Sequence, residues 1–507
     1  MVNVEFILQK RFGVSQTNEL SLLLLAGFRD YKFGNTLHKI VSSKNIDAKI
    51  NALHAAIIMG NIEMTRMLLA YGCCVNTSAF LTPIHIPVIQ KEMSEFSFDD
   101  QYDLTIFNDE ATEEDRINCM IVPLEINPIH LACFRENSTD FVRLLAGRQC
   151  TLLSTAKLST LGFYMLGTSL EYSNFSLKHK TLEAFSELTP LNIASLINNA
   201  HLVEILLSKQ NKIDSVASVF PLHMNTSHCS DIVDLITNQS VFMLTSLNIA
   251  LLNQNSDIVD LLIRYGANVD MSTSLFMEIS IDDMFISTYS TLKAIHLASL
   301  VDEDHNFRTI LSKTKSMDEK CAISVWHLCY LEAINGVKMY QTFDREVEIH
   351  LSALHICCIT RDCARVELLL KSGANCNIPA EIPLVYIQLK SEIRLFKYPL
   401  HLAAESGNLD MCILLLKYSA DNEVKTNVIG FKPWQLALYH GHADVLKCLF
   451  TVRTSINKSS FMFTFLLYLI RTCFGNTVLK FIAKSKNVIV LLSFYRYVMN
   501  ALGFCLV

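Results

Sequence analysis

A short phrase that recurs eleven times along the 507-residue chain limits the possible folds more than any other feature. The phrase begins with a polar or small residue, which is often followed by a proline. An apolar residue comes next, then in most copies a histidine, and then small or apolar residues. The clearest copies begin at residues 53–56 and 398–404. In eight copies two bulky apolar residues follow fourteen and fifteen positions after the histidine position, as Leu68–Leu69 and Leu415–Leu416 do. This constant register indicates an internal repeat.

Each unit has the signals of two short antiparallel helices. Thr189 and Pro190 illustrate the start, because threonine caps free N–H groups and proline at the first helical position gives up no bond. A glycine or polar residue often stands six positions after the histidine position, where a turn is needed. Glycine then recurs eighteen positions after it, where a helix end requires a left-handed residue. The order is therefore cap, helix, turn, helix and glycine stop.

These units resemble the ankyrin repeat, which has the signature T-P-L-H-x-A and a period of about 33 residues. The resemblance implies an all-α solenoid of ten to twelve antiparallel helix pairs, joined by loops or short β-hairpins. It also implies that the signature histidines link neighbouring turns by hydrogen bonds. The structural positions carried over are His54, His85, His130, His223, His296, His327, His355, His401, Gly72, Gly266 and Gly373.

The chain divides into three parts in this interpretation. Residues 1–34 are expected to form an N-terminal helical cap, residues 35–450 the repeat array, and residues 451–507 a basic, apolar tail that ends the array as a degenerate repeat. Insertions are predicted near residues 88–126, 150–186 and 271–290. Asparagine replaces the signature histidine at 192 and 248, so we expect the stretch 192–250 to be the least stable.

Composition excludes several classes of protein. Hydrophobic residues make up 51% and charged residues 18% of the chain, which indicates a packed fold rather than a disordered one. The net charge of −6 gives no electrostatic reason to bind nucleic acid. Sixteen dispersed cysteines and a polar N-terminus predict a reduced, cytoplasmic setting, with nuclear or membrane-associated locations left open.

The sequence contains no motif that predicts catalysis. We find no G-x-S-x-G, H-E-x-x-H or C-x-x-C pattern, and the histidines lie along a rod instead of converging on one point. Cys73–Cys74 and Cys357–Cys358 lack the paired spacing of zinc ligands, so we interpret them as core residues. We therefore expect neither an enzyme nor a metal or other cofactor.

The resemblance implies a protein-interaction scaffold or adaptor that binds partner proteins through the concave face and loops of the array. An alternative is the substrate-recognition subunit of a ubiquitin ligase. A second alternative is a membrane-attached ankyrin protein that uses the C-terminal tail. The tail contains seven Lys and Arg and no acidic residue, but its apolar runs are short or interrupted, at Arg496 for example, so we favour a terminal repeat.

The first predicted insertion carries the candidate partner-binding residues. Residues 92–115 contain ten acidic side chains interleaved with aromatic ones. We single out Phe96, Phe98, Asp99, Asp100, Tyr102, Asp103 and Phe107. Acidic and aromatic residues in alternation favour a segment that binds a basic partner surface, and the alternative is a solvated loop with a few hydrophobic anchors.

Deletion of residues 92–115 tests whether this insertion is a mobile loop. So few apolar side chains cannot offset an ordering entropy of about 1–2 kcal/mol per residue, so the deletion should leave the melting of the remaining chain almost unchanged. Limited proteolysis of the intact chain should cut this segment first. Strong protection of the segment, or collapse of the flanking repeats on its removal, would show that it is part of the folded array.

Overall fold

A computed structural model describes thirteen stretches of the chain. They are residues 52–58, 60–70, 72–81, 124–135, 138–166, 184–209, 212–224, 235–281, 284–301, 303–331, 348–383, 394–427 and 430–451. The chain forms two compact units, residues 1–287 and 288–507. The point of division falls inside strand β8 (Met284–Leu292), which we describe with the second unit.

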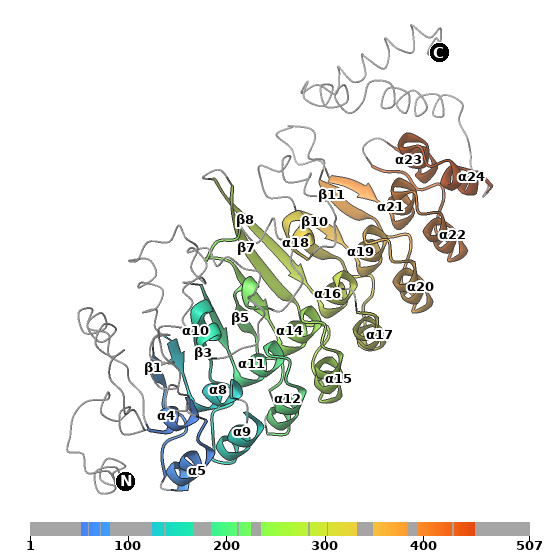
Figure 1. Ribbon diagram of the computed structural model, residues 1–507. Helices are drawn as coiled ribbons and strands as arrows, with labels where there is room; N and C mark the ends of the chain where they lie inside the picture. The colour runs from blue at the N-terminus through green and yellow to red at the C-terminus, as the bar shows by residue number, and fades with distance from the viewer. Residues whose placement is uncertain are drawn as a thin grey trace, which may run out of the picture. The chain divides into compact units, whose positions relative to one another are not determined.

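The described part of the first unit contains four helix pairs, each next to strands (Figure 1). The pairs are α4 (Ala52–Ile58) with α5 (Ile62–Ala70), α8 (Pro128–Cys133) with α9 (Ser138–Ala146), α11 (Pro190–Leu196) with α12 (Ala200–Leu207), and α14 (Ser246–Leu252) with α15 (Ser256–Arg264). The strands are β1 (Ala79–Leu81), β2 (Leu124–Ile126), β3 (Ala156–Ser159), β4 (Phe185–Leu188), β5 (Ala217–Val219), β6 (Val241–Leu244) and β7 (Thr273–Ile281). They pair antiparallel in chain order.

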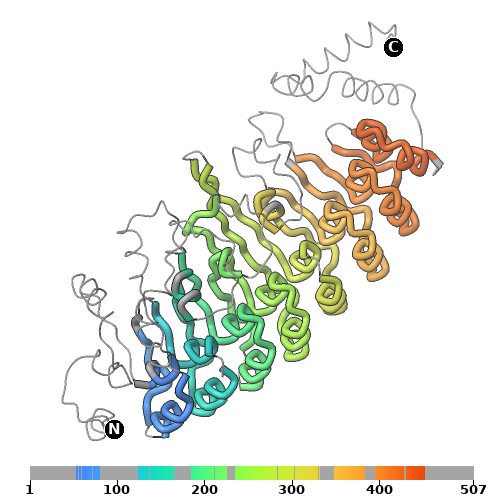
Figure 2. Tube along the Cα trace, in the orientation of Figure 1, coloured from blue at the N-terminus to red at the C-terminus, as the bar shows by residue number. Residues whose placement is uncertain are grey.

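The second unit repeats this arrangement, as the trace in Figure 2 also shows. Its helix pairs are α16 (Ala294–Leu300) with α17 (Asp304–Lys313), α19 (Ala353–Ile359) with α20 (Cys363–Lys371), α21 (Pro399–Ser406) with α22 (Leu409–Lys417), and α23 (Pro433–His440) with α24 (Ala443–Thr451). Strands β8, β9 (Cys321–Ser324), β10 (Glu348–Leu351), β11 (Ala380–Pro383) and β12 (Arg394–Lys397) pair in order.

Local capping accounts for these helices. The Oγ1 atom of Thr189 accepts a hydrogen bond from the backbone N–H of Asn192 and so caps α11. The second helix of several pairs starts with an Asn or Asp whose side chain accepts from the third helical N–H, as Asn408 does for Met411 at 3.0 Å. Gly407 and Asn198 stand at the turns with φ of 73° and 57°, where the sequence predicted a glycine or a polar residue.

The helices of each unit form two rows. In the first unit α4, α8, α11 and α14 pack on one another in chain order, and α5, α9, α12 and α15 form the outer row. In the first unit α11 and α14 are buried on all sides, since every one of their residues is buried. Most strands of the first unit bury one face too, through alternate residues such as Leu124 and Ile126.

The predicted solenoid of repeats is confirmed, but the all-α class is not, because antiparallel strands lie between successive helix pairs. The expected insertion at 271–290 falls in β7 and β8, and that at 150–186 includes β3 and a short helix, α10 (Thr160–Met165). The segments 1–34, 88–123 and 452–507 lie outside the described residues, so the predicted cap and tail stay predictions.

Two of the predicted repeats do not form helix pairs within the described residues. His223 ends a three-residue 3-10 helix, η6 (Pro221–His223), and His327 lies in the six-residue helix α18 (Val325–Tyr330). Both come 31 residues after a signature position of the inner row, and neither has the apolar pair at fourteen and fifteen positions. The segments that follow, residues 225–234 and 332–347, lie outside the described residues, so the second half of each of these two repeats stays a prediction.

The register of the outer helices can be tested on α22. Leu415 has no exposed surface, whereas Leu416 is only partly buried and Ile413 is 49% exposed. Leu415→Ala should cost ~2–5 kcal/mol because it leaves a cavity between helices, and Ile413→Ala should cost less than ~0.5 kcal/mol. Urea unfolding of both variants measures the difference, and equal losses would show that the register is wrong.

Candidate protein-binding surface

The aromatic and acidic residues that the sequence singled out, Phe96 to Phe107, lie outside the described residues, as does His85. The remaining signature histidines are all buried and belong to two groups with different partners. The predicted glycines Gly72, Gly266 and Gly373 have φ of 84°, 92° and 97° and end the outer helices. Ser419 takes the same position after α22 with φ of 67°.

Histidines of the first group join the start of an inner helix to a later loop. In His401, Nδ1 accepts from the backbone N–H of Tyr398 at 3.2 Å, and Nε2 donates to the carbonyl of Phe431 at 2.9 Å. The same pair of bonds is made by His130 to Ser154, His296 to Glu319 and His355 to Ile378. Because one ring nitrogen accepts and the other donates, each imidazole is neutral.

Histidines of the second group bind hydroxyls instead. Nδ1 of His223 lies 2.7 Å from Oγ of Ser186, and its Nε2 lies 2.8 Å from Oγ1 of Thr160. His327 meets Ser290 in the same way at 2.9 Å, and both serines lie 37 residues before their histidine. A serine beside a histidine suggests a nucleophile and base, but all of these side chains are buried, so no substrate reaches them.

Burial lowers the pKa of the signature histidines far below 6.5. Desolvation is the main cause, and it brings the pKa of His355 and His401 to about 4 and that of His223 and His327 to about 3. The carbonyl that accepts from Nε2 opposes this effect only in the first group. These groups therefore stay uncharged at neutral pH and serve the fold.

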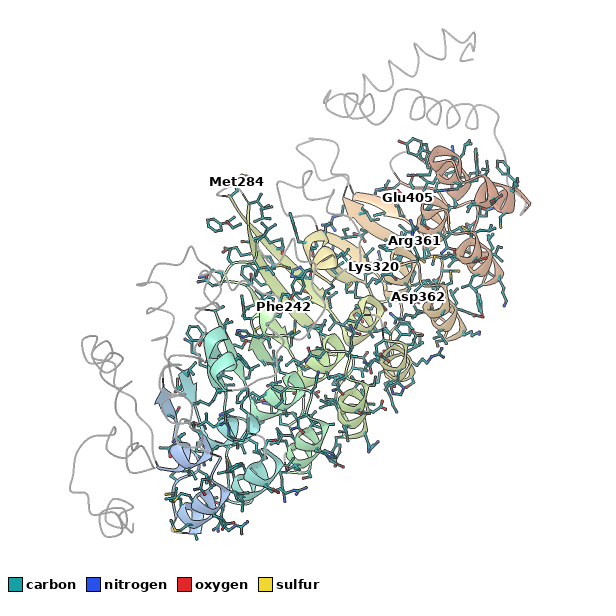
Figure 3. The ribbon with its side chains drawn as sticks, in the orientation of Figure 1. Phe242, Met284, Lys320, Arg361, Asp362 and Glu405 are labelled. Atoms are coloured by element: carbon teal, nitrogen blue, oxygen red, sulfur yellow. The ribbon has the colours of Figure 1, made fainter. Side chains whose placement is uncertain are left out.

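The burial of one position of the inner helices differs between the two units. Four residues after the signature position the first unit has the buried residues Ile58, Phe134, Leu196 and Leu252. Phe163 of α10 packs edge-on against Phe134, with ring centroids 5.9 Å apart. Arg135 donates to the carbonyls of Ile58 and Leu166 and holds the end of α8 there. In the second unit this position changes from buried Leu300 to the partly exposed Tyr439 and Glu405, of which Glu405 is labelled in Figure 3.

The outward face of the strands is an exposed surface of the first unit. Directly opposed residues form a row across it, in the order Glu125, Lys157, Glu187, Ser218 and Met243. Glu125, Lys157, Glu187 and Met243 are exposed, and Lys157 Nζ lies 4.3 Å from the ring centroid of Phe185. The row thus combines charged and apolar side chains, which suits protein recognition.

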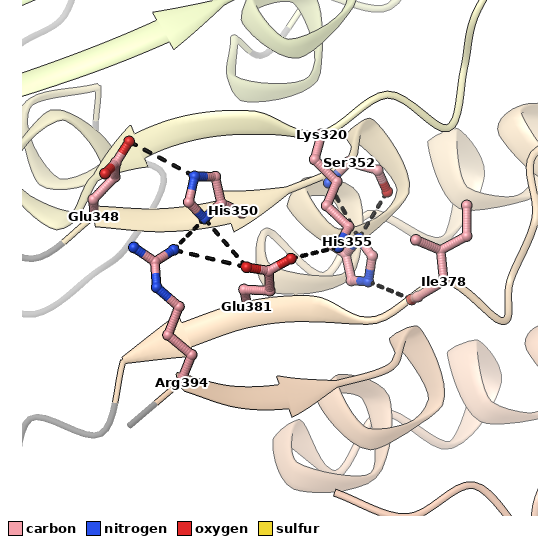
Figure 4. Close-up of polar contacts among 8 residues, drawn as sticks. All are labelled: Lys320, Glu348, His350, Ser352, His355, Ile378, Glu381 and Arg394. Carbon is pink, nitrogen blue, oxygen red and sulfur yellow. Dashed lines mark hydrogen bonds and ion pairs between the residues drawn. The ribbon is translucent and has the colours of Figure 1, made fainter. Parts of the chain in front are cut away.

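The corresponding face of the second unit carries a cluster of charges. His350 of β10 lies directly opposite Glu381 of β11, and Arg394 of β12 and Lys320 before β9 reach the same place (Figure 4). Lys320 Nζ lies 2.9 Å from Oε1 of Glu381. This ion pair and the positive neighbours lower the pKa of the Glu381 carboxyl. We name Lys320, Glu348, His350, Glu381 and Arg394 the strand-face cluster.

The sequence interpretation allowed for loops or short β-hairpins between the helix pairs, but it did not identify the strands or the residues on their outward faces. The missing signal was period-two alternation, as in Glu348-Ile-His350-Leu, where alternate residues are apolar. Within the described ranges, no three His, Cys, Asp or Glu side chains come together in a way that would hold a metal ion. No helix in the same ranges is long and apolar enough to cross a bilayer.

Comparison with known families identifies the class of protein. The family model for ankyrin repeats in three copies matches residues 380–462, and the single ankyrin repeat model matches residues 49–79. No curated protein matches the sequence. The protein is an ankyrin repeat protein, as these matches and the repeated helix pairs show.

Similar solved structures include two ankyrin repeat domains. The human ASB11 ankyrin repeat domain has 14% identity and a TM-score of 0.34, with 65% of this chain and 99% of that one covered. The ankyrin repeat domain of Bcl-3, a member of the IkappaB protein family, has 18% identity and a TM-score of 0.32. Here 53% of this chain and 87% of that one are covered.

The buried histidines predict a pH dependence of stability. The unfolded chain binds protons as pH falls through 6.5, but folded His355 binds one only near pH 4, so stability should fall between these values. His355→Asn should reduce this loss by roughly 2 kcal/mol at pH 5, because 1.5 pH units correspond to that energy. Asparagine already fits this position at Asn192, where it accepts from Thr189 and donates to Ser246.

Urea unfolding of the full chain at pH 7.5 and 5.0 measures the effect. Exposed His201 on α12 supplies the matched control, and His201→Asn should leave the pH dependence unchanged. An equal loss of stability in the wild type and in His355→Asn would contradict the assignment.

Proposed function

We propose that this ankyrin repeat protein is a non-catalytic scaffold or adaptor that binds partner proteins through the outward strand face and its loops. The observation that carries the proposal is that strands bury the residues on one face and expose those on the other. Inward residues such as Ile323 and Ile349 are buried in the core, whereas outward ones such as Glu187 and Met243 are exposed. An interaction surface needs this mixture on a rigid support.

The burial of the inner helices in the first unit supports the same proposal, because it excludes them as a binding surface. In the first unit their residues are buried, so side chains on α8, α11 and α14 cannot contact a partner. In the second unit α21 and α23 do offer partly exposed residues at Glu405 and Tyr439. In this proposal the strands and loops make most contacts with a partner protein, and the ends of α21 and α23 enlarge the binding surface.

We further propose a cytoplasmic location and a partner that is protein rather than nucleic acid, in keeping with the net charge of −6. The ubiquitin-ligase and membrane-attached alternatives depend on the tail, which lies outside the described residues after 451. A comparison of the full chain with one lacking residues 463–507, beyond the family match, separates them from the scaffold.

Affinity capture from cells with the full chain tests the proposal. Met243 is 36% exposed on β6, and Met243→Ser combined with Glu187→Lys should reduce capture of specific partners about 10-fold, since central contacts carry most binding energy. Ile413 on α22 is equally apolar and 49% exposed, and Ile413→Ser should leave capture unchanged. Loss through the Ile413 variant alone would place binding on the outer helices and refute the proposal.

A further inference from the structure

One of the two cations in the strand-face cluster, Arg394, lacks a close ion pair with a carboxylate of the described residues. Three other lysines on the strand side of the second unit each pair with a single glutamate: Lys293 with Glu319 at 2.6 Å, Lys397 with Glu405 at 2.5 Å, and Lys432 with Glu423 at 2.5 Å. Lys320 pairs with Glu381 in the same manner. Arg394 has no such partner, because its nearest carboxylate oxygen in the described residues is Oε2 of Glu381, 3.7 Å away.

Arg394 instead donates a hydrogen bond to a histidine. Its NH1 lies 2.5 Å from Nδ1 of His350. A guanidinium has no acceptor, so Nδ1 must accept, and His350 is neutral with its proton on Nε2. That nitrogen faces Oε1 of Glu348 at 3.8 Å, and Nδ1 also faces Oε2 of Glu381 at 3.7 Å. Figure 4 shows both carboxylates and the guanidinium around the ring.

We propose that this face binds a carboxylate from an acidic segment of a partner protein, and that protonation of His350 strengthens the binding. The inference rests on the proposed function, whose binding site and partner chemistry it specifies. Of the three guanidinium nitrogens of Arg394, NH1 alone makes a polar contact with a described residue, which leaves Nε and NH2 as a fork for a carboxylate. The Arg394 side chain is 31% exposed, and that of Lys320 26%.

The charges around His350 explain the effect of acid. The groups that face it are Glu348 on its own strand, Glu381 on β11, Arg394 on β12 and, through Glu381, Lys320 before β9. With neutral His350 the two cations and two carboxylates cancel. A proton on Nδ1 removes the acceptor of Arg394, frees that N–H for a ligand, and gives the cluster a net charge of +1.

Peptide selection on the full chain tests the proposal. A displayed library of random twelve-residue peptides, selected at pH 5.5, should yield sequences enriched in Asp and Glu. The most enriched peptide, labelled with fluorescein, should bind ~3–10-fold more weakly at pH 7.5, the size expected for one partly screened charge. Arg394→Gln should weaken binding by ~10-fold or more at both pH values, and Arg394→Lys by less, because lysine keeps the charge but not the fork.

His350→Gln keeps a neutral acceptor for Arg394, so it should remove the pH dependence and retain the weaker affinity. Lys371→Gln, on the exposed side of α20, is the matched control and should change nothing. Selected peptides that are not acidic, or that bind Arg394→Gln as tightly, would overturn this inference and leave the proposed function intact. If no peptide is selected and no partner is captured, the proposed function fails with it.

Discussion

The hydrogen bond from the Nε2 of a buried signature histidine to the carbonyl of a later loop is the interaction on which the array depends. Through it His130, His296, His355 and His401 each fix the start of an inner helix relative to the next stretch of chain. Such a bond is worth most inside the protein, where water cannot replace either partner. Because α8, α16, α19 and α21 share this bond, each of these helices keeps the same relation to the loop that its histidine reaches.

The sequence predicted the helix pairs well, because their signals are local. A cap such as Thr189, a turn residue such as Gly407 and an apolar pair such as Leu415–Leu416 each act within a few positions. The buried state of Leu415 follows from that pattern alone. Leu416 was expected to be buried as well, yet it is only partly so, since its exposure depends on the neighbouring pair.

The short units and the strand faces were not predicted, for different physical reasons. The phrases around His223 and His327 satisfy the local signature, but within the described residues they form only a three-residue 3-10 helix and a six-residue α-helix. The strand-face cluster depends on pairing between strands, which places His350 opposite Glu381 although 31 residues separate them. Such a pairing has no local signal, so the sequence leaves it open.

The hydroxyl-bound histidines also set an order of assembly during synthesis. Ser186 in β4 and Thr160 in α10 remain without their imidazole until residue 223 has been made, 37 residues after the serine. At ribosomal rates of about 5–20 residues per second, that interval lasts roughly 2–7 seconds. Ser290 likewise precedes its partner His327 by 37 residues. At these two places the nascent chain therefore completes the contacts of one strand only after the following histidine phrase has been synthesised.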